Sequence, residues 1–520
     1  MTKQTFIKGA MILLAAGIVN RLLGFVPRIA LPRIIGAEGV GLYQLAYPFL
    51  IVLLTLITGG IPLAIAKWIA EADSQGDARR IRQIFNAAMA FVIVLASVLT
   101  IAMLLFAPFI IRHILPDERV YRAFLMMSPI LLIVGISSVF RGYFQGKQNM
   151  IPSAVSQTVE TVIRIVASLV LAYLFLPQGL EWAAAGAMLG VVAGEVGGLL
   201  VMLWKYARDK ARLEGLQSSP DGNEPGEAST PVLRRLLGLS IPVTGSKLVG
   251  SISYLLESIF TARSLASAGI VTGIATAQYG ALQGMIIPLL LLPTALTYSL
   301  AVSLVPSLSE AAARGDKALI HKRLHQSMRI ALVSGAPFAV VMTLFAEPLC
   351  RLIYDHADIA PMLQLMAPIG IFIYLQAPLQ AALQALDKPG AALMNTFVGA
   401  AVKLVLIIQL ASKPELGIYG ALIAINVNIV LVTILHGISV LRYIGFSMKL
   451  FDFVKVGAAM IMMGAAARLT MNHSPLSAEW LSLLAACAAS VVVYLILMVW
   501  MRIIDRYDMA RIPWLGAWFK

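Results

Sequence analysis

Charged residues and cysteines are scarce in this chain of 520 residues, and their scarcity limits what the protein can be. Only 13% of the residues are charged, with 26 Asp and Glu against 40 Lys and Arg, whereas 59% are hydrophobic. The two cysteines, Cys350 and Cys487, lie far apart, which excludes a disulfide framework and a cysteine metal cluster. A soluble protein of this length could not bury so much apolar surface, so the composition predicts a multi-pass membrane protein. Lysines and arginines of cytoplasmic loops explain the net charge of +14, and no nucleic-acid partner is expected.

The apolar residues form long runs rather than short alternating ones, which predicts an all-α fold and argues against a membrane barrel. Far more of the Lys and Arg residues lie on the side that includes the N-terminus, so both termini are predicted to be cytoplasmic. Fourteen transmembrane helices are expected near 9–34, 40–66, 83–111, 123–145, 153–176, 183–204, 236–262, 276–308, 328–349, 360–386, 391–411, 417–441, 453–471 and 480–501.

An internal repeat divides these helices into two matched sets. The sequence EADSQGD at 71–77 follows the second helix, and EAAARGD at 310–316 follows the eighth. Six helices are therefore followed by six of similar design, and two parallel lobes with a central cavity are expected. The predicted boundaries are an N-lobe at 1–207, a flexible cytoplasmic linker at 208–231, a C-lobe at 232–445, and an appendage of helices 13 and 14 with a tail at 446–520.

The first apolar run contains two arginines, Arg21 and Arg28, about two helical turns apart and so on one face. A charge in the middle of a membrane helix costs about 3 kcal/mol on insertion scales. That face should therefore meet protein or water, where it could bind an anionic ligand. The alternative is that each arginine pairs with a nearby acid or carbonyl group and only fixes helix packing.

Two lysines in apolar segments are further candidates for substrate-binding cations. Lys403 occupies the position of the second repeat that matches Arg164, but Gly399 stands where an acid would pair with it. Lys247 lies on the seventh helix, where Ser253 and Glu257 form part of a polar stripe that either lines a cavity or makes a close helix contact.

Three acidic residues complete the set of intramembrane charges. Glu160 and Arg164 have the spacing of an ion pair within one helix. Glu195 lies among glycines that predict close helix packing, and Glu195 and Glu257 are candidates for binding a coupling ion. Cations outnumber acids within the apolar segments, which favours a phosphate-bearing ligand over a cationic drug.

Prolines are expected to bend the second and eighth helices. The acidic groups of the short outer loops, Asp117 with Glu118 and Asp355 with Asp358, are interpreted as solvated turns rather than as a catalytic cluster.

Several motifs resemble those of the multidrug/oligosaccharidyl-lipid/polysaccharide exporter superfamily, which has a MATE-like fold. Within it, the chain is similar to the polysaccharide biosynthesis and stage V sporulation protein B branch, which is related to lipid II flippases. The matching stretches are KQTF at 3–6, RLLGF at 21–25, GAEGVGLY at 36–43, the two Gly-Asp loops, RGYFQG at 141–146, and Gln157 with Glu160 and Arg164.

The resemblance implies a flippase that moves an undecaprenyl-pyrophosphate-linked peptidoglycan precursor, lipid II, or a similar lipid-linked oligosaccharide. It also implies a hydrophobic groove at helices 13 and 14 for the polyprenyl tail. The location would be the bacterial cytoplasmic membrane or a forespore-associated membrane, with cell-wall synthesis proteins as partners. Flippases of this branch carry arginines in helices 2 and 8 that this chain lacks, so Lys247 or Lys403 would replace them.

Three other functions remain as alternatives. A drug/cation antiporter of the same fold would depend on Glu195 and Glu257 rather than on the arginines. An intramembrane enzyme acting on lipid-linked sugars would need acidic or histidine clusters, and we expect a non-enzyme. A scaffold without transport activity would not need cations in a cleft. No cofactor is expected, and coupling to Na⁺ or H⁺ stays open.

Overall fold

The computed structural model describes residues 16–214, 229–446, 448, 450–473, 478–501 and 503. Among them the regular structure is helical, with no strand. Twelve helical segments of this part of the chain are long and apolar enough to cross a membrane. The first of the twelve covers 59 residues, Ala16–Ser74. The all-α membrane fold expected from the composition is therefore confirmed, while the count of fourteen crossings stays a prediction.

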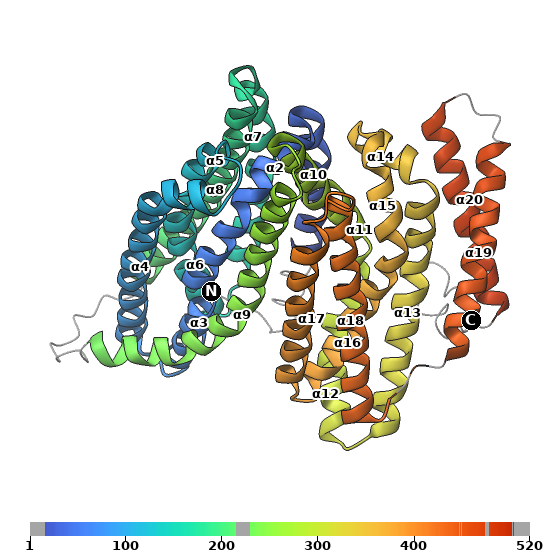
Figure 1. The fold of residues 1–520 in the computed structure, drawn as a ribbon. Helices are drawn as coiled ribbons and strands as arrows, with labels where there is room; N and C mark the ends of the chain where they lie inside the picture. The colour runs from blue at the N-terminus through green and yellow to red at the C-terminus, as the bar shows by residue number, and fades with distance from the viewer. Residues whose placement is uncertain are drawn as a thin grey trace. The chain divides into compact units, whose positions relative to one another are not determined.

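The chain divides into two compact units (Figure 1), residues 1–285 with 412–418, and residues 286–411 with 419–520. The first unit contains a helical segment at 16–23, α2 (Phe25–Thr58), α3 (Ile61–Ser74), α4 (Ala78–His113), α5 (Val120–Met127), α6 (Ile130–Gly146), α7 (Ile151–Phe175), the short η1 (Leu176–Gln178), α8 (Leu180–Glu214), α9 (Ser229–Ser267) and α10 (Thr272–Gly280). A π-helical segment, Ala281–Ile286, follows α10.

The second unit contains α11 (Ile287–Leu290), α12 (Thr294–Ala313), α13 (Lys317–Leu344), α14 (Ala346–Tyr354), η3 (Ala357–Ile359), α15 (Ala360–Met366), η4 (Ala367–Ile369), α16 (Gly370–Ala385), α17 (Pro389–Leu410), α18 (Ile418–Ile444), α19 (Leu450–Asn472) and α20 (Glu479–Trp500). Helices α19 and α20 pack against each other, and α19 also packs on α13.

Several helix boundaries differ from those expected. Helix α2 contains the end of the first predicted helix and most of the second, separated at Gly36, whose φ of 67° breaks the helical path. Helix α8 continues to Glu214 and α9 begins at Ser229, so helix extends into both ends of the predicted linker. The middle of that linker, residues 215–228, lies outside the described residues.

The eighth predicted helix is broken, as its prolines indicate. Its π-helical segment is followed by α11, which has Pro288 in its first turn, and Pro293 then precedes α12. In the second predicted helix the break falls at Gly59 and Gly60, and Pro62 lies in the first turn of α3.

The two Gly-Asp loops of the sequence repeat have the same backbone geometry. Gly76 and Gly315 have φ angles of 71° and 69°, in the left-handed region that glycine adopts without strain. Asp77 then caps α4 by accepting a hydrogen bond from the backbone N–H of Arg80 at 2.8 Å. Asp316 caps α13 in the same way, from Leu319 at 2.9 Å. The repeat in the sequence is therefore a repeat of local structure at these loops.

Candidate functional site

The two arginines that the sequence singles out lie on the N-terminal helices of the first unit. Arg21 belongs to the helical segment 16–23 and Arg28 to α2, and both side chains are exposed. The backbone N–H of Gly24 donates to Asn20, so the chain turns helically between the two arginines. The guanidinium carbon of Arg28 lies 5.8 Å from the centroid of the Phe25 ring. Neither arginine is buried inside its unit.

A pair of tyrosines on α2 brings polar groups close to this arginine face. The rings of Tyr43 and Tyr47 stack with their centroids 5.9 Å apart. Arg28 and Arg164 both lie within electrostatic range of the two tyrosine hydroxyls. The sequence analysis did not select these tyrosines, although their spacing of one helical turn predicts that their side chains are neighbours on the helix.

Glu160 is the centre of an ionic network that links α6, α7 and α8. Its two carboxylate oxygens accept from Arg141 at 3.0 Å and from Arg164 at 3.1 Å. Glu195 of α8 lies next to Glu160, and its Oε2 atom has no hydrogen-bond partner among the described residues. The expected Glu160–Arg164 pair is therefore confirmed. The second hydrogen bond of Glu160, from Arg141, was not predicted.

The glycines around Glu195 allow α8 to pack closely on α7, as the sequence predicts. A Cβ atom at Gly190 would overlap the backbone of Ser168. A Cβ atom at Gly194 would lie 2.6 Å from the Cβ of Arg164. The hydroxyl of Ser156 also donates to the carbonyl oxygen of Gly198 at 2.9 Å. Glu195 thus reaches the network because small residues surround it.

Lys247 of α9 bonds to the break between α2 and α3. Its Nζ donates to the carbonyl oxygen of Gly59 at 2.6 Å. This carbonyl lies at the C-terminal end of α2, where the helix dipole favours a cation. The break itself is tightly packed, because a Cβ atom at Gly60 would overlap the backbone of Ser240. Lys247 therefore has a structural contact, and its ammonium group has further donors for a ligand.

Glu257 of α9 is buried and faces the π-helical segment. Its Oε1 accepts from the amide of Gln283 at 2.9 Å, and Gln283 is also buried. Ser253 lies one turn earlier on α9 and is half-buried. Short π-helical segments are frequent at functional sites. This carboxylate is thus held by a partner that the sequence analysis did not select.

Lys403 lies on α17 and belongs to the second compact unit, unlike the other candidate cations. Its side chain is buried, with 9% of the residue exposed. The structure therefore groups Arg28, Glu160, Arg164, Glu195 and Glu257 within the first unit and places Lys403 in the second.

The loop between α4 and α5 of the first unit, which the sequence analysis placed on the outer side, carries a buried carboxylate. Only 2% of Asp117 is exposed, so the expectation that it lies in a solvated turn is wrong. The carboxylate accepts from Arg119 at 2.9 and 3.0 Å and from the hydroxyl of Thr276 in α10 at 2.7 Å. Arg119 also pairs with Glu38 at 2.7 Å. These hydrogen bonds, with Asp117 the largest contributor, raise the pKa of Arg119. The loop between α4 and α5 is therefore attached to α2 and α10.

Comparison with known proteins assigns the chain to a family. The model of the polysaccharide biosynthesis protein family matches residues 6–312, and the MatE model matches residues 251–408. The chain is 42% identical over 520 residues to stage V sporulation protein B of Bacillus subtilis (strain 168), covering 99% of both chains. The chain belongs to the polysaccharide biosynthesis protein family. It thus lies in the exporter superfamily and branch that its motifs indicate.

More distant relatives agree with this family. The chain is 26% identical over 486 residues to the lipid II flippase MurJ of the same organism, covering 88% of this chain and 86% of that one. Among solved structures, a lipid II flippase MurJ in an inward closed conformation has a TM-score of 0.72 at 14% identity, covering 95% of this chain and 99% of that one. An inward-facing multidrug resistance MATE transporter has a TM-score of 0.64 at 16% identity, covering 82% and 94%. These structures show the fold that the family members share.

Proposed function

We propose that this multi-pass membrane protein is a flippase that moves lipid II, or a similar lipid-linked oligosaccharide, from the inner to the outer leaflet of the cytoplasmic membrane. Its product would serve the synthesis of the cell wall or of the spore cortex. The supporting observation is that Arg21 of the segment 16–23 and Arg28 of α2 keep exposed side chains within the largely apolar residues 16–32. The similarity to stage V sporulation protein B over almost the whole chain also supports the proposed flippase function.

The proposed substrate suits these cations chemically. A pyrophosphate carries several negative oxygens, and guanidinium groups bind such oxygens with paired hydrogen bonds. Lys247 and Lys403 are proposed as additional cations along the path, in place of the family arginines missing from helices 2 and 8. Glu160, Arg164 and Ser253 would support the site, and Glu195 or Glu257 would bind a coupling Na⁺ or H⁺.

The proposed mechanism is alternating access between two matched lobes, the N-lobe at 1–207 and the C-lobe at 232–445, with 446–520 as the appendage. We propose fourteen crossings. The span Ala16–Ser74 would cross twice, with its turn at Gly36, and the broken segment α10 to α12 would cross once in addition to the twelve spans. The polar head would pass through a hydrated cavity while the polyprenyl chain stays in the membrane.

Membrane voltage would assist the transport of an anion. An inside-negative potential favours outward movement by about 2.3 kcal/mol per charge for each 100 mV. Flipping of a pyrophosphate lipid should therefore accelerate when an inside-negative potential is imposed on proteoliposomes.

The decisive experiment is a flipping assay in proteoliposomes. Lipid II should be flipped, and Arg21→Ala or Arg28→Ala should reduce its rate at equal reconstitution. Arg33→Ala is a matched control, because Arg33 is an exposed arginine of α2, as Arg28 is, but lies at the predicted end of the first transmembrane helix, 9–34. Normal flipping by the Arg21→Ala, Arg28→Ala double variant would refute the proposed role of these arginines.

A drug/cation antiporter is the alternative function, and the MatE match over residues 251–408 favours it. The buried carboxylate of Glu257 could then exchange a proton or sodium ion for a cationic substrate. This alternative predicts that Glu257→Gln abolishes cation transport and that the arginine variants keep it. Transport of lipid II but not of cations by the unmodified protein would exclude the antiporter.

A further inference from the structure

The first unit contains a polar pocket of about 510 Å³ between the start of α5 and the start of α8. The two helices pack against each other (Figure 1). The volume of the pocket falls within the range of roughly 300–1,000 Å³ that is typical of small-molecule sites. None of its residues belongs to the proposed transport site. Its polar and aromatic lining consists of Glu118, Arg119, Tyr121, Arg122, Glu181 and Trp182.

One wall of the pocket is a single face of α5. Tyr121 and Leu125 are four residues apart, as are Arg122 and Met126, so these four side chains lie together on the helix. Leu125 and Met126 are half-buried, whereas Tyr121 is exposed. This wall therefore combines apolar surface with a hydroxyl and a guanidinium group.

Arg122 is held by the two residues that α8 contributes. Its Nε donates to a carboxylate oxygen of Glu181 at 3.0 Å, and its guanidinium carbon lies 4.0 Å from the centroid of the Trp182 ring. The ring of Phe175 contacts Trp182 at an interplanar angle of 79°. The side chains of Arg122 and Glu181 nevertheless stay 38% and 31% exposed. A positioned donor and a positioned acceptor therefore lie side by side next to an aromatic ring.

The charges of the two guanidinium groups are already compensated. Arg119 pairs with Asp117 and with Glu38, and Arg122 pairs with one carboxylate. Neither group has charge left over for a phosphate or a carboxylate ligand. The side chain of Glu118 is exposed and has no hydrogen-bond partner among the described residues, so it is available as an acceptor.

A neutral ligand with both donors and acceptors fits such a lining. Each hydroxyl group of a sugar can donate to a carboxylate and accept from a guanidinium at the same time. The C–H groups of a pyranose ring form an apolar surface that packs against an indole ring or against Leu125 and Met126. An anion would use only the donors of this pocket, and an ammonium group only its acceptors.

We propose that this pocket binds a neutral saccharide. The predicted orientation places this end of the first unit on the outer side of the membrane. The source of the sugar rests on the proposed function, since it would be the saccharide of a lipid-linked oligosaccharide that has reached the outer leaflet. Binding itself does not require transport, so the two proposals can be tested separately.

The test uses the full chain in nanodiscs and the disaccharide N,N′-diacetylchitobiose with a photoreactive diazirine in one acyl group. After illumination, peptide mass spectrometry should find cross-links on 118–126 and on 181–182, and excess unlabelled disaccharide should remove them. Trp182→Leu should lower the cross-linking several-fold, because the sugar loses its aromatic contact. Trp480→Leu is the matched control, because Trp480 is an exposed tryptophan at the start of α20 that does not line the pocket, and it should change nothing.

The donor is tested in the same way. Arg122→Gln should also lower the cross-linking several-fold, whereas Arg112→Gln, which changes an exposed arginine in the last turn of α4, should leave it unchanged. Because Arg122→Gln also breaks the pair with Glu181, Tyr121→Ala provides a variant that removes only an exposed side chain of the pocket. It should weaken cross-linking even if Arg122→Gln fails to fold.

Other outcomes would overturn the proposal. Competition by tri-alanine as strong as that by unlabelled chitobiose would assign the pocket to a peptide, and equally strong competition by cadaverine would assign it to a cation. Unchanged cross-linking in both Trp182→Leu and Tyr121→Ala would place the sugar elsewhere. Absence of cross-linking in a protein that flips lipid II would refute the saccharide site alone. Specific cross-linking in a protein that flips no lipid would refute the proposed function and keep the site.

Discussion

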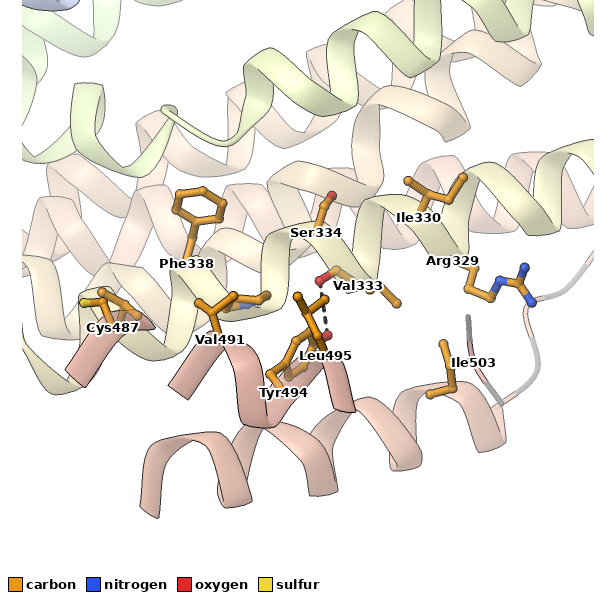
Figure 2. Close-up of a pocket in the computed structure, with 12 residues that line it drawn as sticks. Arg329, Ile330, Val333, Ser334, Phe338, Cys487, Val491, Tyr494, Leu495 and Ile503 are labelled. Atoms are coloured by element: carbon orange, nitrogen blue, oxygen red, sulfur yellow. Dashed lines mark hydrogen bonds between the residues drawn. The ribbon is translucent and has the colours of Figure 1, made fainter. Parts of the chain in front are cut away.

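The hydroxyl of Tyr494 donates a hydrogen bond to the carbonyl oxygen of Val333 at 3.1 Å (Figure 2). Pro337 lies four residues after Val333 and has no N–H group, so this carbonyl lacks its normal helical donor. Tyr494 is itself fully buried. The proline of α13 therefore creates the acceptor through which α20 is attached, as neighbouring helices do at membrane prolines.

A double-mutant cycle can test this relationship. Tyr494→Phe should destabilise the protein by about 0.5–1 kcal/mol, because the Val333 carbonyl loses its donor in an apolar environment. In a Pro337→Ala background the helix supplies an N–H at residue 337, so the same substitution should cost less. Thermal unfolding in detergent would measure both differences. Equal losses in the two backgrounds would show that the proline and the tyrosine are not coupled.

The ionic network predicts unequal effects for its two acidic residues. Glu160→Gln leaves Arg141 and Arg164 facing each other without a carboxylate between them. We expect a loss of about 2 kcal/mol, below the range for fully buried pairs because the arginine side chains are 24% and 33% exposed. Glu195→Gln should cost much less, because one of its oxygens has no partner among the described residues. A larger loss for Glu195→Gln would contradict the proposed order of the network, and thermal unfolding would measure both.

A contact between α2 and α10 depends on two glycines. A Cβ atom at Gly41 would overlap the carbonyl of Thr276, and one at Gly280 would overlap the backbone of Ala37. Gly41→Ala should therefore destabilise the protein by about 1–3 kcal/mol, as overpacking does. Gly238→Ala in α9 is the matched control, because no atom lies within 4 Å of its added Cβ. It should be neutral or stabilising by up to about 1 kcal/mol. The yield of folded protein and its melting temperature would distinguish the two variants.

Local features of this structure could be predicted from the sequence because nearby residues determine them. The two Gly-Asp loops required only a glycine with positive φ and an aspartate at the helix start, and both were visible as a repeat. The same holds for the glycine face of α8 and for the Glu160–Arg164 pair, since their spacing within one helix fixes which side they occupy.

Contacts between segments that are distant in the sequence could not be predicted, because spacing within one helix does not determine them. Arg141 lies near the end of an apolar run, where a cytoplasmic position explains an arginine equally well, and only the packing of α6 on α7 shows its bond to Glu160. Pro337 leaves the carbonyl oxygen of Val333 without its helical donor, but no residue close in the sequence indicates that Tyr494 donates to it. Asp117 was expected to lie in a solvated turn, and its contact with Thr276 of α10, far away in the sequence, could not be predicted.

The loop between α4 and α5 provides a final prediction, because Arg119 pairs with one buried and one half-buried acid. Asp117 is almost completely buried and accepts from three N–H groups of Arg119 and from the hydroxyl of Thr276, so Asp117→Ala should remove the acceptor of all four and cost about 2 kcal/mol. The side chain of Glu38 is 32% exposed, and water can replace its pairing with Arg119, so Glu38→Ala should cost no more than about 1 kcal/mol. High salt should weaken the contribution of Glu38 and leave that of Asp117 nearly unchanged, since buried pairs are screened less. Thermal unfolding at low and high salt would measure these contributions. Equal losses for the two variants, or a salt-sensitive loss for Asp117→Ala, would show that the loop is held by general electrostatic attraction rather than by the buried hydrogen bonds of Asp117.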